Sequence, residues 1–169
     1  MVKLENVPEF YRGYVSNAED TSIVIQLIQG GDDTLSIYKD ATPQQIDYRY
    51  AEGKWTAKEL LAHMIDAERV FAYRALRFAR NDKNVLNGFD EELYSKEMNI
   101  SNRSIMQLIN EYANLRASTV DLFTGFSDEM MKREGYVDRN KMSVEMIGYI
   151  IIGHEIHHKR VLKEKYEII

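Results

Sequence analysis

Four long stretches of this 169-residue chain repeat apolar side chains at intervals of three and four residues. On an α-helix this spacing places the apolar side chains on one face, which must be buried against another element. The chain has two prolines, Pro8 and Pro43, and both lie outside the four stretches. The pattern predicts an all-α protein, and four amphipathic helices with connections of unequal length are typical of a four-helix bundle. We expect residues 1–169 to form a single domain, since this length suits one sizeable core.

The first predicted helix contains a pair of residues that should interrupt it, whereas the second has a clearly marked start. The first spans about residues 18–38, and the pair Gly30–Gly31 predicts a kink or a break, because glycine costs roughly 1 kcal/mol per helical position. The second spans about residues 56–80 and begins at a capping box, in which Thr56 and Glu59 satisfy each other's backbone amides.

The second half of the chain predicts two further long helices. The third spans about residues 102–123, and the fourth begins at the N-cap residue Ser143 and continues to about residue 166. Shorter helical pieces are expected at residues 44–46 and 91–98, the latter inside an irregular region. No stretch forms a convincing strand.

Composition excludes several classes of function. The chain has no cysteine, which fits a reducing cytoplasm and means that any thiol chemistry must use an external thiol. Its net charge is −5 with no basic block, so we expect no nucleic-acid partner. No apolar run approaches the roughly 20 residues that span a bilayer, and no signal peptide is evident, so we expect a cytoplasmic protein without a membrane partner.

The histidines are the strongest candidates for chemistry. His154 and His158 are separated by four residues on the fourth predicted helix and therefore share a face. That face continues the apolar stripe, so the two imidazoles should point into the core, where each needs a partner. His63 lies on the apolar stripe of the second predicted helix. Facing helices of a bundle commonly build metal sites in this way.

Three neutral imidazoles suit one divalent transition metal ion, with zinc, nickel or iron favoured and copper also compatible. They leave coordination positions open for water or substrate. The alternative is that His154 and His158 are core or boundary residues bonded to carboxylates or backbone. His157 lies nearer the edge of the face and is expected at the surface or supporting a ligand from outside the metal's coordination sphere.

Residues 154–158 also match the HExxH string of zinc proteases literally, which would make Glu155 a general base. That function needs a further ligand beyond His158 and a cleft bordered by a sheet. Only eleven residues follow His158, and none is histidine. The protease interpretation is therefore disfavoured.

Two segments resemble a known family. Residues 55–63, WTAKELLAH, resemble the W-[ST]-x-x-E-x-x-x-H segment of the DinB/YfiT-like superfamily, and residues 153–158, GHEIHH, resemble its closing GHxxHH element. Their order, interval and helical setting also agree with that family. The resemblance implies a four-helix bundle that holds a divalent metal on His63, His154 and His158.

The resemblance also implies a range of activities and a homodimer. Some members are similar to bacillithiol S-transferases, which move a low-molecular-weight thiol onto an electrophile. Others are metal-dependent hydrolases, which would use a metal-bound hydroxide, and many have no established activity. Three functions therefore stay open for this chain: a metal-dependent transferase acting on a small-molecule substrate with an external thiol, a hydrolase, and a non-catalytic metal-binding stress protein.

Carboxylates near His63 are candidates to orient a ligand. Asp66 or Glu68 could accept a ring N–H and fix the tautomer of a histidine. The alternative, a solvated or salt-bridged carboxylate, is favoured for Glu68 and equally weighted for Asp66.

Overall fold

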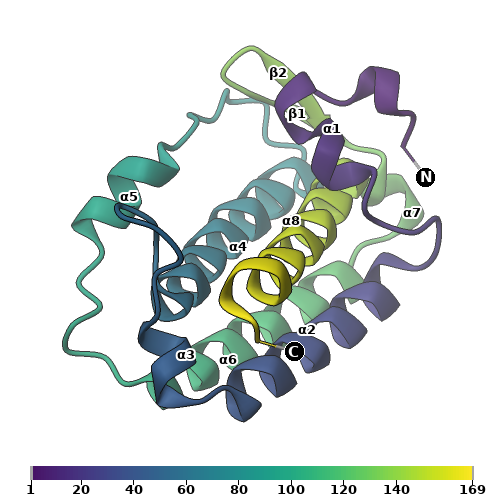
Figure 1. The fold of residues 1–169 in the computed structure, drawn as a ribbon. Helices are drawn as coiled ribbons and strands as arrows, with labels where there is room; N and C mark the ends of the chain where they lie inside the picture. Colours follow the sequence, from purple (N-terminus) through teal and green to yellow (C-terminus); the bar gives the residue numbers. More distant parts are fainter. Residues whose placement is uncertain (1, 169) are drawn as a thin grey trace.

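The computed structural model describes residues 2–168, and four long helices form its centre (Figure 1). They are α2 (Ile23–Asp40), α4 (Ala57–Ala79), α6 (Ile105–Thr124) and α8 (Val144–Tyr166). Helix α4 packs against α6 and α8, and α2 packs against the same two helices. The first two long helices, α2 and α4, therefore occupy opposite corners of the bundle. The predicted all-α four-helix bundle is confirmed.

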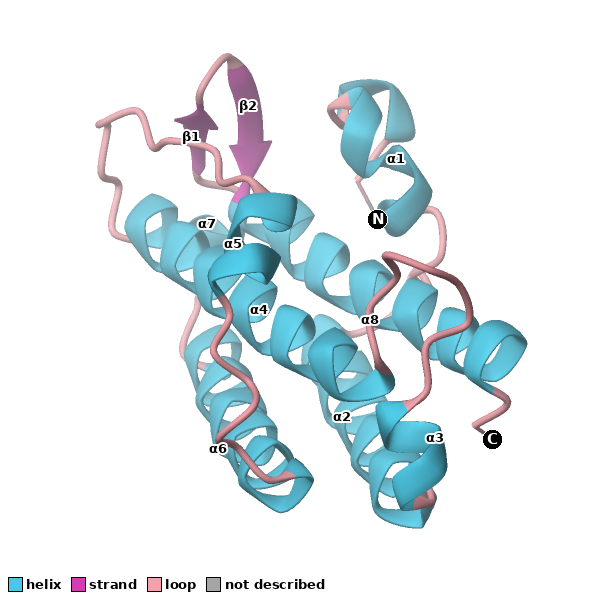
Figure 2. Cartoon of the chain, turned by 60° about the vertical axis from the view of Figure 1, so that its left-hand side comes forward, coloured by secondary structure: helices cyan, strands magenta, loops and turns pink. Residues whose placement is uncertain are grey.

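Shorter elements surround the bundle (Figure 2). They are the 3-10 turn Leu4–Asn6, α1 (Glu9–Val15), α3 (Pro43–Asp47), α5 (Glu91–Glu97) and α7 (Asp128–Met131). Helix α1 packs on α8, whereas α3 and α5 pack on α4. Of these, α1 places Tyr14 against His154 of α8, and α5 places Glu92 in a cavity that His157 and His158 of α8 also line. The pieces predicted at residues 44–46 and 91–98 correspond to α3 and α5.

The expectation that the chain has no strand is wrong. Strands β1 (Glu134–Val137) and β2 (Asn140–Ser143) pair antiparallel, with Val137 opposite Asn140. Asp138 in the connecting turn has φ +50°, a conformation that aspartate tolerates better than most residues. Each strand has only four residues, which is too short to produce a clear alternating pattern in the sequence.

The break predicted at Gly30–Gly31 is also absent, because α2 is helical from Ile23 to Asp40. Both glycines are buried, and side chains from other helices use the room that a Cβ would take. A Cβ at Gly30 would overlap the Glu155 carboxylate, and one at Gly31 would lie 2.8 Å from Cγ of Arg116. The two glycines therefore permit close packing at the bundle centre.

Helix starts agree with the capping signals in the sequence. Thr56 and Glu59 form the predicted capping box of α4, and the Ser143 hydroxyl accepts a hydrogen bond from the Met146 amide at the start of α8. No helix among residues 2–168 combines the length and apolar content needed to cross a membrane.

Candidate metal centre

Helix α4 fixes the position of His63. The Thr56 amide donates to Glu59 Oε2 at 2.6 Å, and the Glu59 amide donates to Thr56 Oγ1 at 3.1 Å, so the first turn is well defined. His63 follows about two turns later and is 4% exposed. The Trp55 ring, just before the cap, lies 4.7 Å from the His63 ring. The capping segment thus also provides one wall of the histidine environment.

Helix α8 carries the other two histidines, and α1 covers one of them. A Cβ at Gly153 would overlap the Tyr14 backbone carbonyl, so glycine at this position lets α1 approach α8 closely. The Tyr14 ring then packs edge-on to His154, with ring centroids 5.2 Å apart. His154 is 4% exposed and His158 is 8% exposed.

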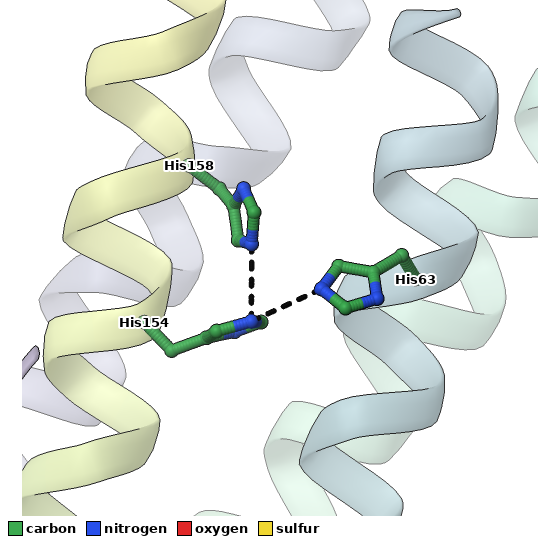
Figure 3. A group of neighbouring side chains, drawn as sticks. All are labelled: His63, His154 and His158. Carbon is green, nitrogen blue, oxygen red and sulfur yellow. Dashed lines mark hydrogen bonds between the residues drawn. The ribbon is translucent and has the colours of Figure 1, made fainter. Parts of the chain in front are cut away.

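The three imidazoles converge on one point (Figure 3). His154 Nε2 lies 3.1 Å from His63 Nε2 and 3.0 Å from His158 Nε2. A ring nitrogen has either one proton or one in-plane lone pair, so hydrogen bonds satisfy two such neighbours poorly. A tetrahedral ion with Zn–N bonds of about 2.0–2.1 Å separates its nitrogen ligands by roughly 3.3 Å. The observed donor set fits such an ion.

Burial keeps these imidazoles neutral. Desolvation lowers the pKa of His63 to about 4. Burial, followed by repulsion from neighbouring histidines, holds the pKa of His154 and of His158 well below the usual value. At neutral pH each ring therefore has a lone pair available for a metal.

A cavity of about 200 Å³ lies beside the histidines. His158 and His157 form part of its wall, and Trp55 and Tyr50 provide aromatic surface. Glu92, from α5, is the acidic residue in the lining. The cavity thus offers a space with both polar and apolar walls, including one carboxylate, next to His158 of the convergent group.

The Glu155 side chain is held in a polar cluster formed with residues of α2 and α6. Thr34 donates to Glu155 Oε1 at 2.8 Å, and the Tyr112 hydroxyl donates to the same atom. Arg116 Nη1 donates to Glu155 Oε2 at 2.9 Å. Because both carboxylate oxygens are occupied, Glu155 is poorly placed to act as the general base of an HExxH protease.

Arg116 joins this cluster to Glu68. Arg116 Nη2 lies 2.8 Å from Glu68 Oε2, and both side chains are buried. Burial alone would lower the pKa of Arg116, but Tyr112, Glu155 and Glu68 together raise it well above its usual value. Glu68 is therefore the salt-bridged residue that the sequence favoured, although it is buried.

The remaining candidates from the sequence lie at the edge of the site. Asp66 is paired with Arg69 at 3.6 Å, and among the described residues no hydrogen bond connects it to a histidine. His157 lies outside the convergent group, with its ring centroid 5.6 Å from that of Tyr14. Burial, and then the Arg160 charge, lower the pKa of His157.

Sequence reasoning did not assign Tyr14, Glu92 or a site role for Trp55. Trp55 precedes the capping box and could have been connected with His63 through the position of the helix start. Tyr14 and Glu92 lie on the short helices α1 and α5. No pattern in the nearby sequence indicates where these helices pack against α4 and α8.

The sequence profile of the DinB superfamily matches residues 26–162, which include all three convergent histidines. The chain belongs to the DinB superfamily. No curated protein sequence matches it significantly. The family resemblance noted in the sequence is therefore confirmed.

Two solved structures from Bacillus subtilis share the fold of this DinB protein. YfiT, described as a probable metal-dependent hydrolase with an unusual four-helix bundle topology, superposes with a TM-score of 0.74 at 17% identity. The match covers 89% of this chain and 90% of YfiT. YjoA, described as a DinB-like protein, gives a TM-score of 0.64 at 18% identity, covering 87% and 90% of the two chains.

Proposed function

We propose that this DinB protein is a metal-dependent enzyme that transfers an external low-molecular-weight thiol to an electrophilic small molecule. The convergence of the His63, His154 and His158 Nε2 atoms carries the proposal. These residues would hold one divalent transition metal ion. When bound, such an ion favours deprotonation of a thiol or of water at neutral pH.

The surroundings of the histidines suit thiol transfer. A thiol has a pKa near 8.5 and needs little help to ionise, so no dedicated base is required. This agrees with Glu155, whose oxygens are engaged by Thr34, Tyr112 and Arg116. Trp55 and Tyr50 give the adjacent cavity an apolar wall for the electrophile. The chain has no cysteine, so its own residues provide no competing thiol.

Hydrolysis is the second candidate. The description of YfiT as a probable metal-dependent hydrolase supports it, as does the Glu92 carboxylate in the same cavity as His158. In this alternative, Glu92 would accept a proton from the attacking water. General base assistance of this kind contributes about 10²–10⁴-fold to rate.

Turnover assays on the metal-loaded protein separate these functions. We would supply the alkylating fluorophore monobromobimane with a panel of small thiols, and in parallel supply activated esters without thiol. Thiol transfer predicts saturable, thiol-dependent product formation that disappears in His154→Ala and persists in Glu92→Gln. Hydrolysis predicts ester cleavage that falls by about 10²-fold in Glu92→Gln.

The matched control is His157→Ala, which changes a histidine that lines the cavity but lies outside the convergent group. Metal content in this variant should stay close to that of the unmodified protein, because the change removes none of the convergent ligands. Metal occupancy without turnover in either assay would contradict both enzyme proposals and favour a metal-binding stress protein.

A further inference from the structure

A second cavity, of about 500 Å³, lies between α4 and the loop that connects α4 to α5. This loop runs along the outer side of the bundle (Figure 1). Arg69, Arg74 and Arg77 line the cavity from α4, and its described lining contains no acidic side chain. Phe89 and Tyr94 add aromatic surface from the opposite wall. The composition of the wall favours a negatively charged occupant.

Arg74 is the unusual residue of this cavity. It is 2% exposed, and its guanidinium is flanked by the rings of Phe71 and Phe89, with Cζ 5.7 Å and 5.5 Å from the two centroids. Nη2 donates to the backbone carbonyl of Asn87 at 3.0 Å. Nη1 is buried and has no hydrogen-bond partner among the described residues.

The charge of Arg74 is also uncompensated. The two other arginines of the cavity have carboxylate partners, since Arg69 pairs with Glu111 at 2.5 Å and Arg77 pairs with Asp82. Arg74 forms no ion pair with a carboxylate of residues 2–168. A buried charge without a counter-charge is costly, and an unsatisfied buried donor adds to that cost.

The neighbouring acidic groups do not provide the missing partner. Asp138 Oδ2 is engaged in accepting a hydrogen bond from the Gly88 amide at 3.0 Å. Glu91 lies close enough to Tyr11 to influence its hydroxyl, as Arg74 does, but makes no ion pair with Arg74. Burial raises the pKa of the Tyr11 hydroxyl overall, although Arg74 lies close enough for its guanidinium to lower that pKa, so the hydroxyl stays neutral and provides no counter-charge.

We infer that Arg74 binds an oxyanion, a carboxylate or phosphate group of a small molecule that occupies the cavity between α4 and the α4–α5 loop. The guanidinium provides the planar donor edge that such groups prefer. Because Nη1 is buried, a ligand can reach it only if one of the side chains packed around the guanidinium moves aside. The Phe89 ring is only partly buried and belongs to the irregular loop, so it is the side chain most easily moved.

This site is distinct from the histidine cluster, and its occupation does not require the proposed function. The Phe71 ring lies between the two, with its centroid 6.2 Å from that of His154. A ligand anchored at Arg74 is therefore separated from the candidate metal ligands by one aromatic side chain.

Binding can be observed on the full-length protein by NMR of the arginine Nε–Hε groups. Inorganic phosphate and malonate are titrated separately at constant ionic strength, with chloride as the reference. We expect a saturable shift of the Arg74 resonance with at least one of them. A response to phosphate alone identifies a phosphate ligand, and a response to malonate alone identifies a carboxylate ligand.

Variants then test the residue. Arg74→Met should weaken binding by roughly 10-fold or more, the usual range for a charged hydrogen bond. Arg80→Gln, which changes an exposed arginine at the C-cap of the same helix, should leave affinity unchanged. If Arg74→Met does not fold, the NMR titration of the unmodified protein still decides. Absence of a saturable Arg74 shift with either anion, or equal affinity in a folded Arg74→Met protein, would overturn the inference.

Discussion

Replacing Arg116 with methionine should destabilise the protein by about 3–5 kcal/mol at pH 7, the usual cost of breaking a buried ion pair. Arg116 makes three hydrogen bonds to Glu68, at 2.8, 3.0 and 3.2 Å, and one to Glu155 at 2.9 Å. It also donates to the backbone carbonyl of Leu27 at 2.9 Å. The arginine therefore connects α2, α4, α6 and α8 at the centre of the bundle.

The magnitude follows from which carboxylate is left without a partner. After the change, Glu155 keeps Thr34 and Tyr112 as donors, but Glu68 loses all the side-chain hydrogen bonds that the structure gives it. Replacing Glu68 with methionine as well removes that uncompensated charge. The double variant should therefore be less destabilised than Arg116→Met, by about 2 kcal/mol, within the usual range for directly interacting residues.

Urea denaturation followed by circular dichroism measures both quantities, with a chelator present so that metal binding does not contribute. A cost below about 1 kcal/mol for Arg116→Met would refute the reasoning, since it lies outside the range for a buried pair. Greater destabilisation in the double variant than in the single one would refute it too.

Two further predictions concern packing and pH. Gly153→Ala should destabilise the folded protein by about 1–3 kcal/mol, because the added Cβ would overlap the Tyr14 backbone. The control is Gly13→Ala, where no atom lies within 4 Å of the added Cβ; in the same urea experiment it should be neutral or stabilising. With chelator present, stability should fall as pH is lowered from about 6.5 toward 4, because unfolded histidines bind protons in this range while folded His63, with its pKa lowered to about 4, does not. His63 alone should account for a loss of about 3 kcal/mol in the free energy of unfolding between about pH 6.5 and pH 4. A pH dependence in His63→Asn equal to that of the unmodified protein would contradict this assignment.

Much of the fold could be predicted because its signals are local. The Thr56 capping box and the Ser143 cap gave the starts of α4 and α8 correctly. By contrast, α2 begins at Ile23 after the cap Ser22 and passes uninterrupted through Gly30 and Gly31. The contacts that favour glycine there come from Arg116 and Glu155, which are distant in sequence. Local propensity alone could not reveal this tertiary constraint.

In the candidate site, too, the features set by local sequence could be predicted and those set by tertiary packing could not. Helical spacing brought His154 and His158 together, and the apolar stripe of α4 directed His63 toward them. The surroundings depend on how helices are rotated and placed, so the Tyr14 cover and the Glu92 wall were not predictable. The polar cluster around Glu155 was missed for the same reason: its hydroxyl donors lie on α2 and α6.

Metal content per chain tests the central claim most directly. The protein and its single histidine variants would be purified without added metal, loaded with one equivalent of zinc, dialysed and measured by elemental mass spectrometry. We predict about one ion per chain in the unmodified protein and in His157→Ala, and strong loss in His63→Ala, His154→Ala and His158→Ala, since each removes a ligand. Full occupancy in a folded variant lacking all three of these histidines would contradict the account.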